Sequence, residues 1–299
     1  MTRLPYDEFG LFHENAEEFG IPFTGPPVVE RVAATMPDGR RISALRFGSE
    51  PPALVLLHGG AQNAHTYDTV VLALSRPVLC IDLPGHGHSD GGAGGALDPV
   101  SNAADLAEAI RQLAPTPTLL VGMSLGGLTA IAFAAAHPTL VRSLVLIDIT
   151  PGVNGEKAKH ITDFVQGPAT FDSFDDLLER TRAFNPSRSV ASLRRGILHN
   201  AEQLPDGSWQ WRYARHRDVA ASRSIEPGFL WEALGSLTVP VTLVRGMAAG
   251  SVVDDDDEAR FEATAASGSV VRIDGAGHSV QGDRPLELAA LLDDLIHRP

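Results

Sequence analysis

The 299-residue sequence has a single cysteine, Cys80, and fewer basic than acidic side chains. One cysteine cannot form an internal disulfide, and Cys80 lies in the apolar run 77–81, so we expect a small buried hydrophobe rather than a reactive thiol. The 24 Lys and Arg against 37 Asp and Glu give a net charge of -13. This charge opposes non-specific binding to nucleic acid or to an anionic membrane surface.

Long apolar segments are also missing. No apolar run approaches the roughly 20 residues that a membrane-spanning helix needs, and the first eight residues, MTRLPYDE, lack the apolar core of a signal peptide. We therefore expect a cytoplasmic protein with no membrane partner. A hydrophobic content of 43% and a charged content of 20% are typical of a soluble globular protein with a sizeable core.

Continuous apolar runs typical of strands buried on both faces recur along the chain. They are residues 53–57, 77–81, 118–121, 143–147, 239–244 and 269–273. Stretches with helical patterns separate most of them, and this alternation predicts a parallel α/β sheet with catalytic groups at the carboxyl ends of its strands. Residues 28–47 alternate around Pro37-Asp38-Gly39 and predict an antiparallel hairpin at the sheet edge.

The pattern changes between about 151 and 238, where helical stretches appear without a run of the buried-strand type. This segment holds 11 basic and 11 acidic residues, so the acidic surplus lies outside it. We predict a helical cap, 151–238, inserted into a core formed by 28–150 and 239–299. Residues 1–27 form an N-terminal extension without an assigned function, and the aromatic cluster 209–213 could line a pocket or pack the cap.

A Gly-x-Ser-x-Gly sequence, Gly122 to Gly126, lies between a predicted strand and an Ala-rich predicted helix. A sharp turn there brings the strand and helix backbones close together, so Gly122 and Gly126 must be small. Ser124, at the apex of the turn, is then exposed in a strained backbone conformation close to a helix N-terminus. This placement is typical of a nucleophilic serine.

The run His86-Gly87-His88-Ser89-Asp90 offers a rival reading, because it opens like the zinc motif of a metallo-hydrolase. Zinc needs three or four converging ligands, and Gly91 stands where that motif has another histidine. The alternative is a tight loop shaped by Pro84, Gly85 and Gly87, in which both histidines are solvated. We favour the loop and expect no metal.

Four motifs occur in order: His58-Gly59; Asp82-x-Pro84-Gly85-x-Gly87-x-Ser89; Gly122-x-Ser124-x-Gly126-Gly127; and Gly275-x-Gly277-His278 followed by Asp283-x-Pro285. With them the chain resembles the α/β-hydrolase fold family from about residue 28 onward. The resemblance implies an eight-stranded, mostly parallel sheet flanked by helices, with a cap inserted after the sixth strand. It also implies acyl transfer through a covalent intermediate, without a cofactor.

Within this resemblance, Ser124 is the candidate nucleophile and His278 the base that it needs at neutral pH. The N–H groups of Leu125 and Gly60 are the expected oxyanion donors, with Ala61 in reserve. We expect His58 to brace the loop rather than to act as the base.

The acid departs from the usual family pattern. The loop 246–253, where family members usually carry an Asp, has no carboxylate before Asp254. Some members instead supply the acid at the end of the sixth strand, where Asp148 stands. A carboxylate there needs a partner to justify its desolvation, and a histidine N–H is suitable. We therefore favour Asp148 and keep Asp254 in reserve.

The resemblance thus implies a serine hydrolase that cleaves a small to medium, rather apolar carboxylic ester. Ser rather than Asp at position 124 sets aside the branches that attack with Asp. Lactone opening, thioester hydrolysis and carbon–carbon bond hydrolysis stay open for the same site, and a non-catalytic small-ligand-binding member of the fold is an alternative of another class. The sequence identifies neither the substrate nor the oligomeric state.

Overall fold

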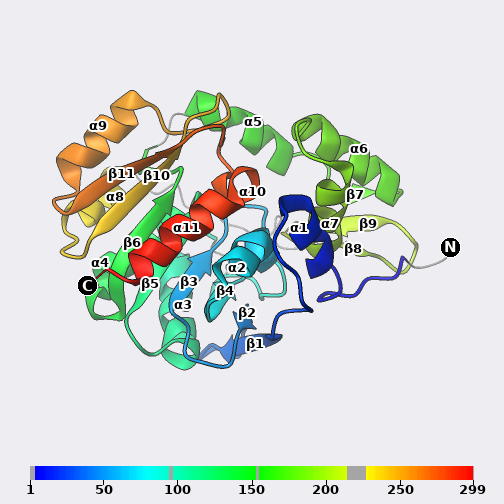
Figure 1. Cartoon of the computed structure of the whole chain (residues 1–299), viewed down its shortest axis with the longest axis horizontal. Helices are drawn as coiled ribbons and strands as arrows, with labels where there is room; N and C mark the ends of the chain where they lie inside the picture. Colours follow the sequence, from blue (N-terminus) through cyan, green and yellow to red (C-terminus); the bar gives the residue numbers. More distant parts are fainter. Residues whose placement is uncertain (1–3, 94–96, 153–154, 214–226, 299) are drawn as a thin grey trace.

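A computed structural model describes residues 4–93, 97–152, 155–213 and 227–298, and its centre is an eight-stranded sheet of order β1-β2-β4-β3-β5-β6-β10-β11 (Figure 1). Strands β1 and β2, and β2 and β4, pair antiparallel, and the other pairs are parallel. This confirms the predicted fold class and edge hairpin. The strands are β1 (Val29–Thr35), β2 (Arg41–Phe47), β3 (Leu54–Leu57), β4 (Val78–Ile81), β5 (Thr118–Met123), β6 (Val141–Ile147), β10 (Val241–Gly246) and β11 (Gly268–Ile273).

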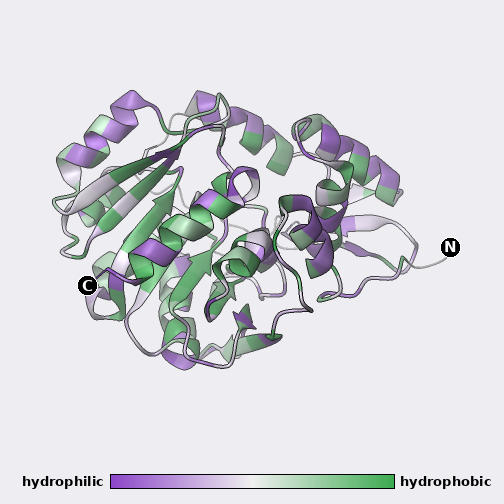
Figure 2. Ribbon diagram, viewed as in Figure 1, coloured by the Kyte–Doolittle hydropathy of each residue, from purple (hydrophilic) through white to green (hydrophobic). Residues whose placement is uncertain are grey.

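Helices cover both faces of the sheet, which is why the central strands are continuously apolar (Figure 2). One face packs against α1 (Phe12–Phe19), α2 (Asp68–Leu74), α10 (Val280–Asp283) and α11 (Pro285–Ile296). The other packs against α3 (Pro99–Leu113), α4 (Leu125–Ala136), α8 (Pro227–Gly235) and α9 (Asp255–Thr264). In β5, Leu119 and Val121 point to the first face and Leu120 to the second. In the described part of the chain, this core also contains the short 3-10 helices η1 (Ala64–Tyr67) and η3 (Pro138–Leu140).

The segment between β6 and β10 contains helices, as predicted, and also a small antiparallel sheet of order β7-β9-β8. The sequence did not indicate this sheet, because its strands are only two or three residues long. The aromatic cluster packs within this segment, since Trp209 and Trp211 are buried against Phe174 and Phe171. The elements are α5 (Gly155–Val165), β7 (Thr170–Phe171), α6 (Phe174–Phe184), α7 (Val190–Asn200), β8 (Ala201–Gln203) and β9 (Trp209–Trp211).

Helix α8 lies inside the predicted cap but packs with the sheet domain. Leu230, Trp231 and Leu234 are buried in the same cluster as residues of α4 and the central strands. Below, "cap" means the elements α5 to β9, and the division at residues 151 and 238 stays a prediction.

The N-terminal extension contacts both the core and the cap. Phe12 of α1 packs edge-on against Phe47 of β2, with ring centroids 5.9 Å apart. On its other side, Arg195 of α7 forms ion pairs with Glu14, at 3.5 Å, and with Glu18. The segment therefore joins α7 to the sheet, a role that its sequence did not indicate.

None of the helices in the described part of the chain is both long and apolar enough to cross a membrane.

The turn at Gly122 gives a test of the packing. A Cβ at Gly122 would collide with the carbonyl of Gly126, whereas a Cβ at Gly196, in the exposed part of α7, would meet no atom within 4 Å. We expect Gly122→Ala to lower the free energy of unfolding by about 3 kcal/mol or more, and Gly196→Ala to raise it by about 0.5–1 kcal/mol. Chemical denaturation of both variants measures this contrast, and equal stabilities would contradict it.

Candidate active site

Ser124 stands between β5 and α4 in a backbone conformation that few L-residues adopt, with φ 51° and ψ −118°. The glycine-rich loop after β3 reaches the same place, because a Cβ on Gly59 would lie 3.3 Å from the Cβ of Ser124. A Cβ on Gly126 would collide with backbone of residues 57 and 58. These close approaches explain why the turn needs small residues around Ser124.

His278 and Asp148 form a hydrogen bond, with 2.9 Å between Nδ1 of the ring and Oδ2 of the carboxylate. The two residues are 130 positions apart in the chain and follow β11 and β6. The loop that carries His278 is fixed from two sides. The His278 N–H donates to the carbonyl of Gly250 at 3.1 Å, and the Gly277 N–H donates to the carboxylate of Asp283 at 2.9 Å.

The Asp148 carboxylate is fully buried and accepts three further hydrogen bonds from the last residue of β10 and the loop that follows it. Oδ1 accepts from the Gly246 N–H at 3.0 Å and from the Ser251 hydroxyl at 2.6 Å, and Oδ2 accepts from the Val252 N–H at 3.0 Å. A buried carboxylate needs such partners to offset its desolvation. With both oxygens engaged, the side chain has one defined orientation toward the imidazole.

The loop after β3 places the candidate oxyanion donors beside the start of α4. A Cβ on Gly60 would lie 4.0 Å from a methyl group of Leu125, the first residue of α4. The first N–H groups of a helix have no partner within the helix, so the Leu125 N–H is available by its position. Ala61 has φ 60°, which turns the chain sharply after Gly60.

His58 braces this loop, as the sequence led us to expect. Its Nε2 accepts the Leu83 N–H at 2.9 Å, so Nδ1 carries the proton and donates to the carbonyl of Gly59 at 2.7 Å. Full burial, and then the neighbouring His86, lower the pKa of His58 to about 3. His58 is thus neutral near pH 7 with both ring nitrogens engaged.

Asp254, the reserve acid, caps a helix. Its carboxylate accepts the Asp257 N–H at 2.9 Å in a capping box at the start of α9, and it pairs with Lys157 at 3.1 Å. The Asp257 N–H and Lys157 hold the pKa of this exposed carboxyl below its usual value. The structure therefore brings Asp148, and not Asp254, to His278.

The side chains of the zinc-like run 86–90 have partners of other kinds. His86 donates from Nδ1 to the carbonyl of Pro84 at 3.0 Å, and the Asp90 carboxylate accepts the Arg41 N–H at 2.7 Å. The loop closes around the buried Asp82, which accepts the His88 N–H at 3.1 Å. The run is thus a tight loop, as we expected, and His88 is exposed. The expectation that His86 is solvated was wrong, because its ring is buried beside that of His58, with centroids 5.1 Å apart.

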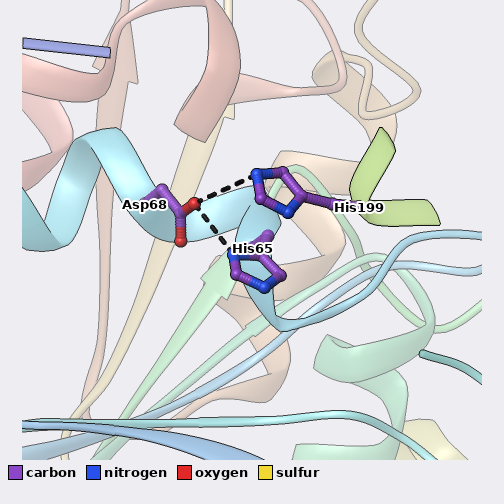
Figure 3. Close-up of side chains that lie close together, drawn as sticks. All are labelled: His65, Asp68 and His199. Carbon is purple, nitrogen blue, oxygen red and sulfur yellow. Dashed lines mark hydrogen bonds and ion pairs between the residues drawn. The ribbon is translucent and has the colours of Figure 1, made fainter. Parts of the chain in front are cut away.

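Three buried side chains at the junction of core and cap bring possible metal ligands within 4.8 Å of one another: His65, Asp68 and His199. His65 and Asp68 come from the η1–α2 segment and His199 from the end of α7 (Figure 3). The His65 Nδ1 lies 2.9 Å from Asp68 Oδ2, and the His199 Nε2 lies 3.8 Å from the same oxygen.

This cluster does not fit a metal ion, because the two imidazoles are stacked. Their centroids are 3.8 Å apart and their planes differ by only 12°. A metal binds an imidazole nitrogen close to the ring plane at about 2.0–2.1 Å, and one ion cannot lie in two parallel planes at once. The arrangement instead fits a proton on His65, which also lies 3.2 Å from Glu8 on its Nε2 side.

A cavity of about 350 Å³ opens between α5 and the loop after β10. Lys157, His160 and Met247 are among the residues that line it, together with Ser251, which binds Asp148. The residues that line the cavity do not include Ser124 or His278. The cavity therefore lies against the loop after β10 and not over the candidate nucleophile.

Comparison with protein families gives a match between residues 54–291 and the model of the Alpha/beta hydrolase family. The chain belongs to this family.

Among its relatives in the α/β-hydrolase family, the chain is 43% identical to Esterase Rv0045c of Mycobacterium tuberculosis over 293 residues, which cover 96% of this chain and 94% of that protein. It is 26% identical to Lipase LipV of the same organism, over 83% of this chain and 94% of that protein.

Solved structures agree with this assignment. A structure of the M. tuberculosis esterase Rv0045c, from work on its transition metal inhibition, superposes with a TM-score of 0.86 at 42% identity, covering 99% of this chain and all of that chain. E-2-(Acetamidomethylene)succinate hydrolase superposes with a TM-score of 0.76 at 23% identity, covering 90% of this chain and all of that chain. This second likeness concerns the fold alone.

Several residues of this α/β-hydrolase site were not predicted. Ser251 and Val252 bind the carboxylate of Asp148 from the loop that lacks a carboxylate of its own before Asp254. Asn200 donates to the carbonyl of Ala61 from the cap, and no sequence pattern connects these two positions. The hydroxyl of Ser251, in the loop after β10, was the feature of the sequence that could have indicated this contact with Asp148.

The charge on His65 gives a prediction for stability against pH. Burial alone would lower its pKa, but the carboxylates of Asp68 and Glu8 outweigh burial and raise the pKa to about 9, while the nearby Arg31 opposes them. The neighbouring His199 has its pKa lowered by burial and by the charge of His65. A pKa that is higher in the folded than in the unfolded protein stabilises the fold below pH 6.5, and this gain disappears as pH rises toward 9.

We therefore expect His65→Gln to lower the free energy of unfolding by up to about 3 kcal/mol at pH 6, and by much less at pH 9. Urea denaturation of wild type and variant between pH 6 and 9 measures the difference, and the exposed His297→Gln is the matched control. A difference that stays constant or grows with pH would contradict a protonated His65.

Proposed function

We propose that this chain, an ester-bond hydrolase by family, cleaves a small to medium carboxylic ester through an acyl-enzyme intermediate on Ser124. The observation that carries the proposal is the 2.9 Å hydrogen bond between His278 and the buried Asp148. It forms at the strand-end edge of the sheet, where Ser124 follows the strand next to β6. A nucleophile, a base and an orienting acid on neighbouring strand ends are the set that acyl transfer needs.

In the first half of the reaction, the Ser124 hydroxyl adds to the ester carbonyl and its proton passes to Nε2 of His278. The Asp148 carboxylate holds the Nδ1 proton and stabilises the imidazolium that forms. The carbonyl π electrons move to oxygen, and the N–H groups of Leu125 and Gly60, with Ala61 in reserve, bind that oxyanion. When the intermediate collapses, the ester C–O bond breaks and His278 returns the proton to the leaving alkoxide.

In the second half, His278 takes a proton from water as the water oxygen adds to the acyl carbon. The same N–H groups bind the second oxyanion. Collapse breaks the bond to Ser124, the proton returns to the serine oxygen, and the carboxylic acid leaves. No external oxidant, reductant or co-reactant other than water is required.

Lactones, thioesters and carbon–carbon bonds next to a carbonyl could be cleaved by the same groups, so a substrate panel is part of the test. Esters, lactones and thioesters of graded acyl length would show which carbonyl compound gives the highest kcat/KM. The proposal predicts that carboxylic esters lead this panel.

The nucleophile is tested by covalent labelling. A fluorophosphonate probe should modify Ser124, and Ser124→Ala should abolish both labelling and hydrolysis of a short p-nitrophenyl ester. His278→Ala should slow both by several orders of magnitude, because the hydroxyl loses its base. Peptide mass spectrometry of the labelled protein locates the adduct, and an adduct on another residue would refute the assignment.

The two candidate acids are separated by matched substitutions. Asp148→Asn keeps the shape but removes the charge that orients and stabilises the imidazolium, so we expect kcat to fall about 10³–10⁴-fold. Asp254→Asn should leave kcat within about twofold, since an Asn can still cap α9. Steady-state ester hydrolysis by the two variants decides between them, and the reverse ranking would make Asp254 the acid.

A further inference from the structure

The loop after β3, residues 58–62, carries the candidate oxyanion donors and is called the oxyanion loop below. It accepts a hydrogen bond from the cap. Asn200, the last residue of α7, donates from Nδ2 to the carbonyl oxygen of Ala61 at 2.6 Å. Its own Oδ1 accepts from Nδ2 of Asn63 at 3.2 Å, and Oδ1 of Asn63 accepts the His65 N–H at 2.9 Å. This chain of contacts fixes which end of the Asn200 amide faces Ala61.

The loop needs such anchors because its backbone is a tight, strained turn. The Gln62 N–H donates back to the carbonyl of Gly59 at 3.2 Å, and Ala61 lies between them with φ 60°. A non-glycine residue in this region costs about 1–3 kcal/mol and persists only where its surroundings hold it. Without support, this strain would favour another path of the loop, which would turn its N–H groups in other directions.

Two side chains hold carbonyl groups of this turn, one from each part of the molecule. His58 holds the carbonyl of Gly59 from the core at 2.7 Å, and Asn200 holds that of Ala61 from the cap. Because a peptide unit is planar, fixing a carbonyl also fixes the direction of the N–H on the same unit. The Gly59 carbonyl shares its unit with the Gly60 N–H, and the Ala61 carbonyl shares its unit with the Gln62 N–H. These two held units flank the unit that carries the Ala61 N–H, so the two anchors together set the path of residues 59–62.

The position of Asn200 depends in turn on how α7 is seated. The carbonyl of His199 accepts from Nδ2 of Asn63 at 3.1 Å, and the His199 Nδ1 bonds the Tyr6 hydroxyl at 2.8 Å. Arg195, one turn earlier in α7, is buried and pairs with Glu14 and Glu18 of α1. The end of α7 is therefore held by both the core and the N-terminal segment.

We propose that Asn200 is a positioning residue for the oxyanion hole: it holds the Ala61 carbonyl so that the Gly60 and Ala61 N–H groups face the reacting carbonyl. This inference rests on the proposed function, because it concerns the same oxyanion. It makes the seating of the cap a condition for stabilising the transition state, in addition to any role of the cap in binding substrate.

The test compares Asn200→Ala with wild type on a p-nitrophenyl ester. Loss of an oxyanion donor costs about 10²–10³ in kcat, and a loop that is only loosened should cost less, so we expect kcat to fall about 10–100-fold with KM within about twofold. Asn200→Asp keeps the shape and can still accept from Asn63, but it turns an acceptor toward the Ala61 carbonyl. Its kcat should fall at least as far as that of Asn200→Ala.

A pair of inhibitors separates positioning from simple packing. An alkyl trifluoromethyl ketone forms a hemiketal: the Ser124 oxygen bonds to the ketone carbon, the π electrons move to oxygen and the proton passes to His278. Its Ki should rise in Asn200→Ala by the same factor as kcat/KM falls. The methyl ketone of equal chain length, which binds largely without this addition, should keep its Ki within about twofold.

Gln203→Ala is the matched control. It removes amide hydrogen bonds with Gly207, at 3.2 Å, and with Leu4, at 3.1 Å, only three residues beyond Asn200. Its kcat should stay within about twofold, and thermal melts should show both variants folded at the assay temperature.

Three results would overturn the inference. In the first, folded Asn200→Ala and Asn200→Asp keep wild-type kcat. In the second, KM and the Ki values of both ketones rise together while kcat is unchanged, which would indicate that Asn200 only supports packing. In the third, wild type shows no Ser124-dependent turnover, which refutes the proposed function and the inference with it.

Discussion

The buried carboxylate of Asp148 is the constraint on which the candidate site depends. A charge without solvent must be paired or hydrogen-bonded, and here four donors meet that demand: Gly246, Ser251, Val252 and His278. They come from the end of β10 and from the loops after β10 and β11, and the sheet register sets Ile147 beside Val244 and Gly246 beside Ile273. One carboxylate therefore fixes three strand ends relative to one another.

The same hydrogen bond determines the state of the imidazole. With the Nδ1 proton directed to Asp148, the neutral ring of His278 presents Nε2 as an acceptor. That is the tautomer a general base requires, and it follows from the carboxylate's need for a donor. Replacing His278 would remove one of the four donors to the buried carboxylate, and replacing Asp148 would leave the Nδ1 proton without its acceptor, so the two residues depend on each other.

Backbone strain is concentrated at the same edge of the sheet. Four non-glycine residues in the described part of the chain have positive φ, and three of them, Ala61, Ser124 and Asp148, follow β3, β5 and β6. These strands are neighbours at the centre of the sheet and are almost wholly buried. A rigid, well-packed centre can hold conformations that cost about 1–3 kcal/mol each. Because such conformations lower the stability of the fold, their presence at these three turns is typical of a functional site.

The sequence was sufficient where the signal is local. Continuous apolar runs marked the central strands. The missing carboxylate before Asp254 pointed to Asp148, which forms a hydrogen bond with His278, and its role as the acid stays a proposal. The sequence was insufficient where the determinant is a contact between distant positions. Strands of two or three residues carry no periodicity, so the cap sheet was missed. Asn200 and Ala61 are 139 positions apart, and nothing in either neighbourhood identifies the other.

The N-terminal segment shows why such contacts matter for the whole site. Burial alone would raise the pKa of Glu8, but His65 and Arg31 outweigh burial and lower it to about 2. Glu8 therefore stays charged, and Arg31 lies between it and the buried Asp82, at 2.8 Å from the latter. Glu8, Arg31 and Asp82 thus form a row of alternating charges. Removing one of them would leave its neighbours without a partner, so these ion pairs hold the N-terminal segment to the core.

Because α1 on the same segment also pairs with Arg195, the attachment of the cap depends on residues that precede the sheet. The model of the Alpha/beta hydrolase family matches only from residue 54, so this attachment lies outside the pattern shared by the whole family. The 43% identical esterase aligns over 96% of the chain, which extends the likeness beyond that pattern. The N-terminal segment that holds the cap thus lies outside the pattern of the whole family but inside the likeness to this one relative.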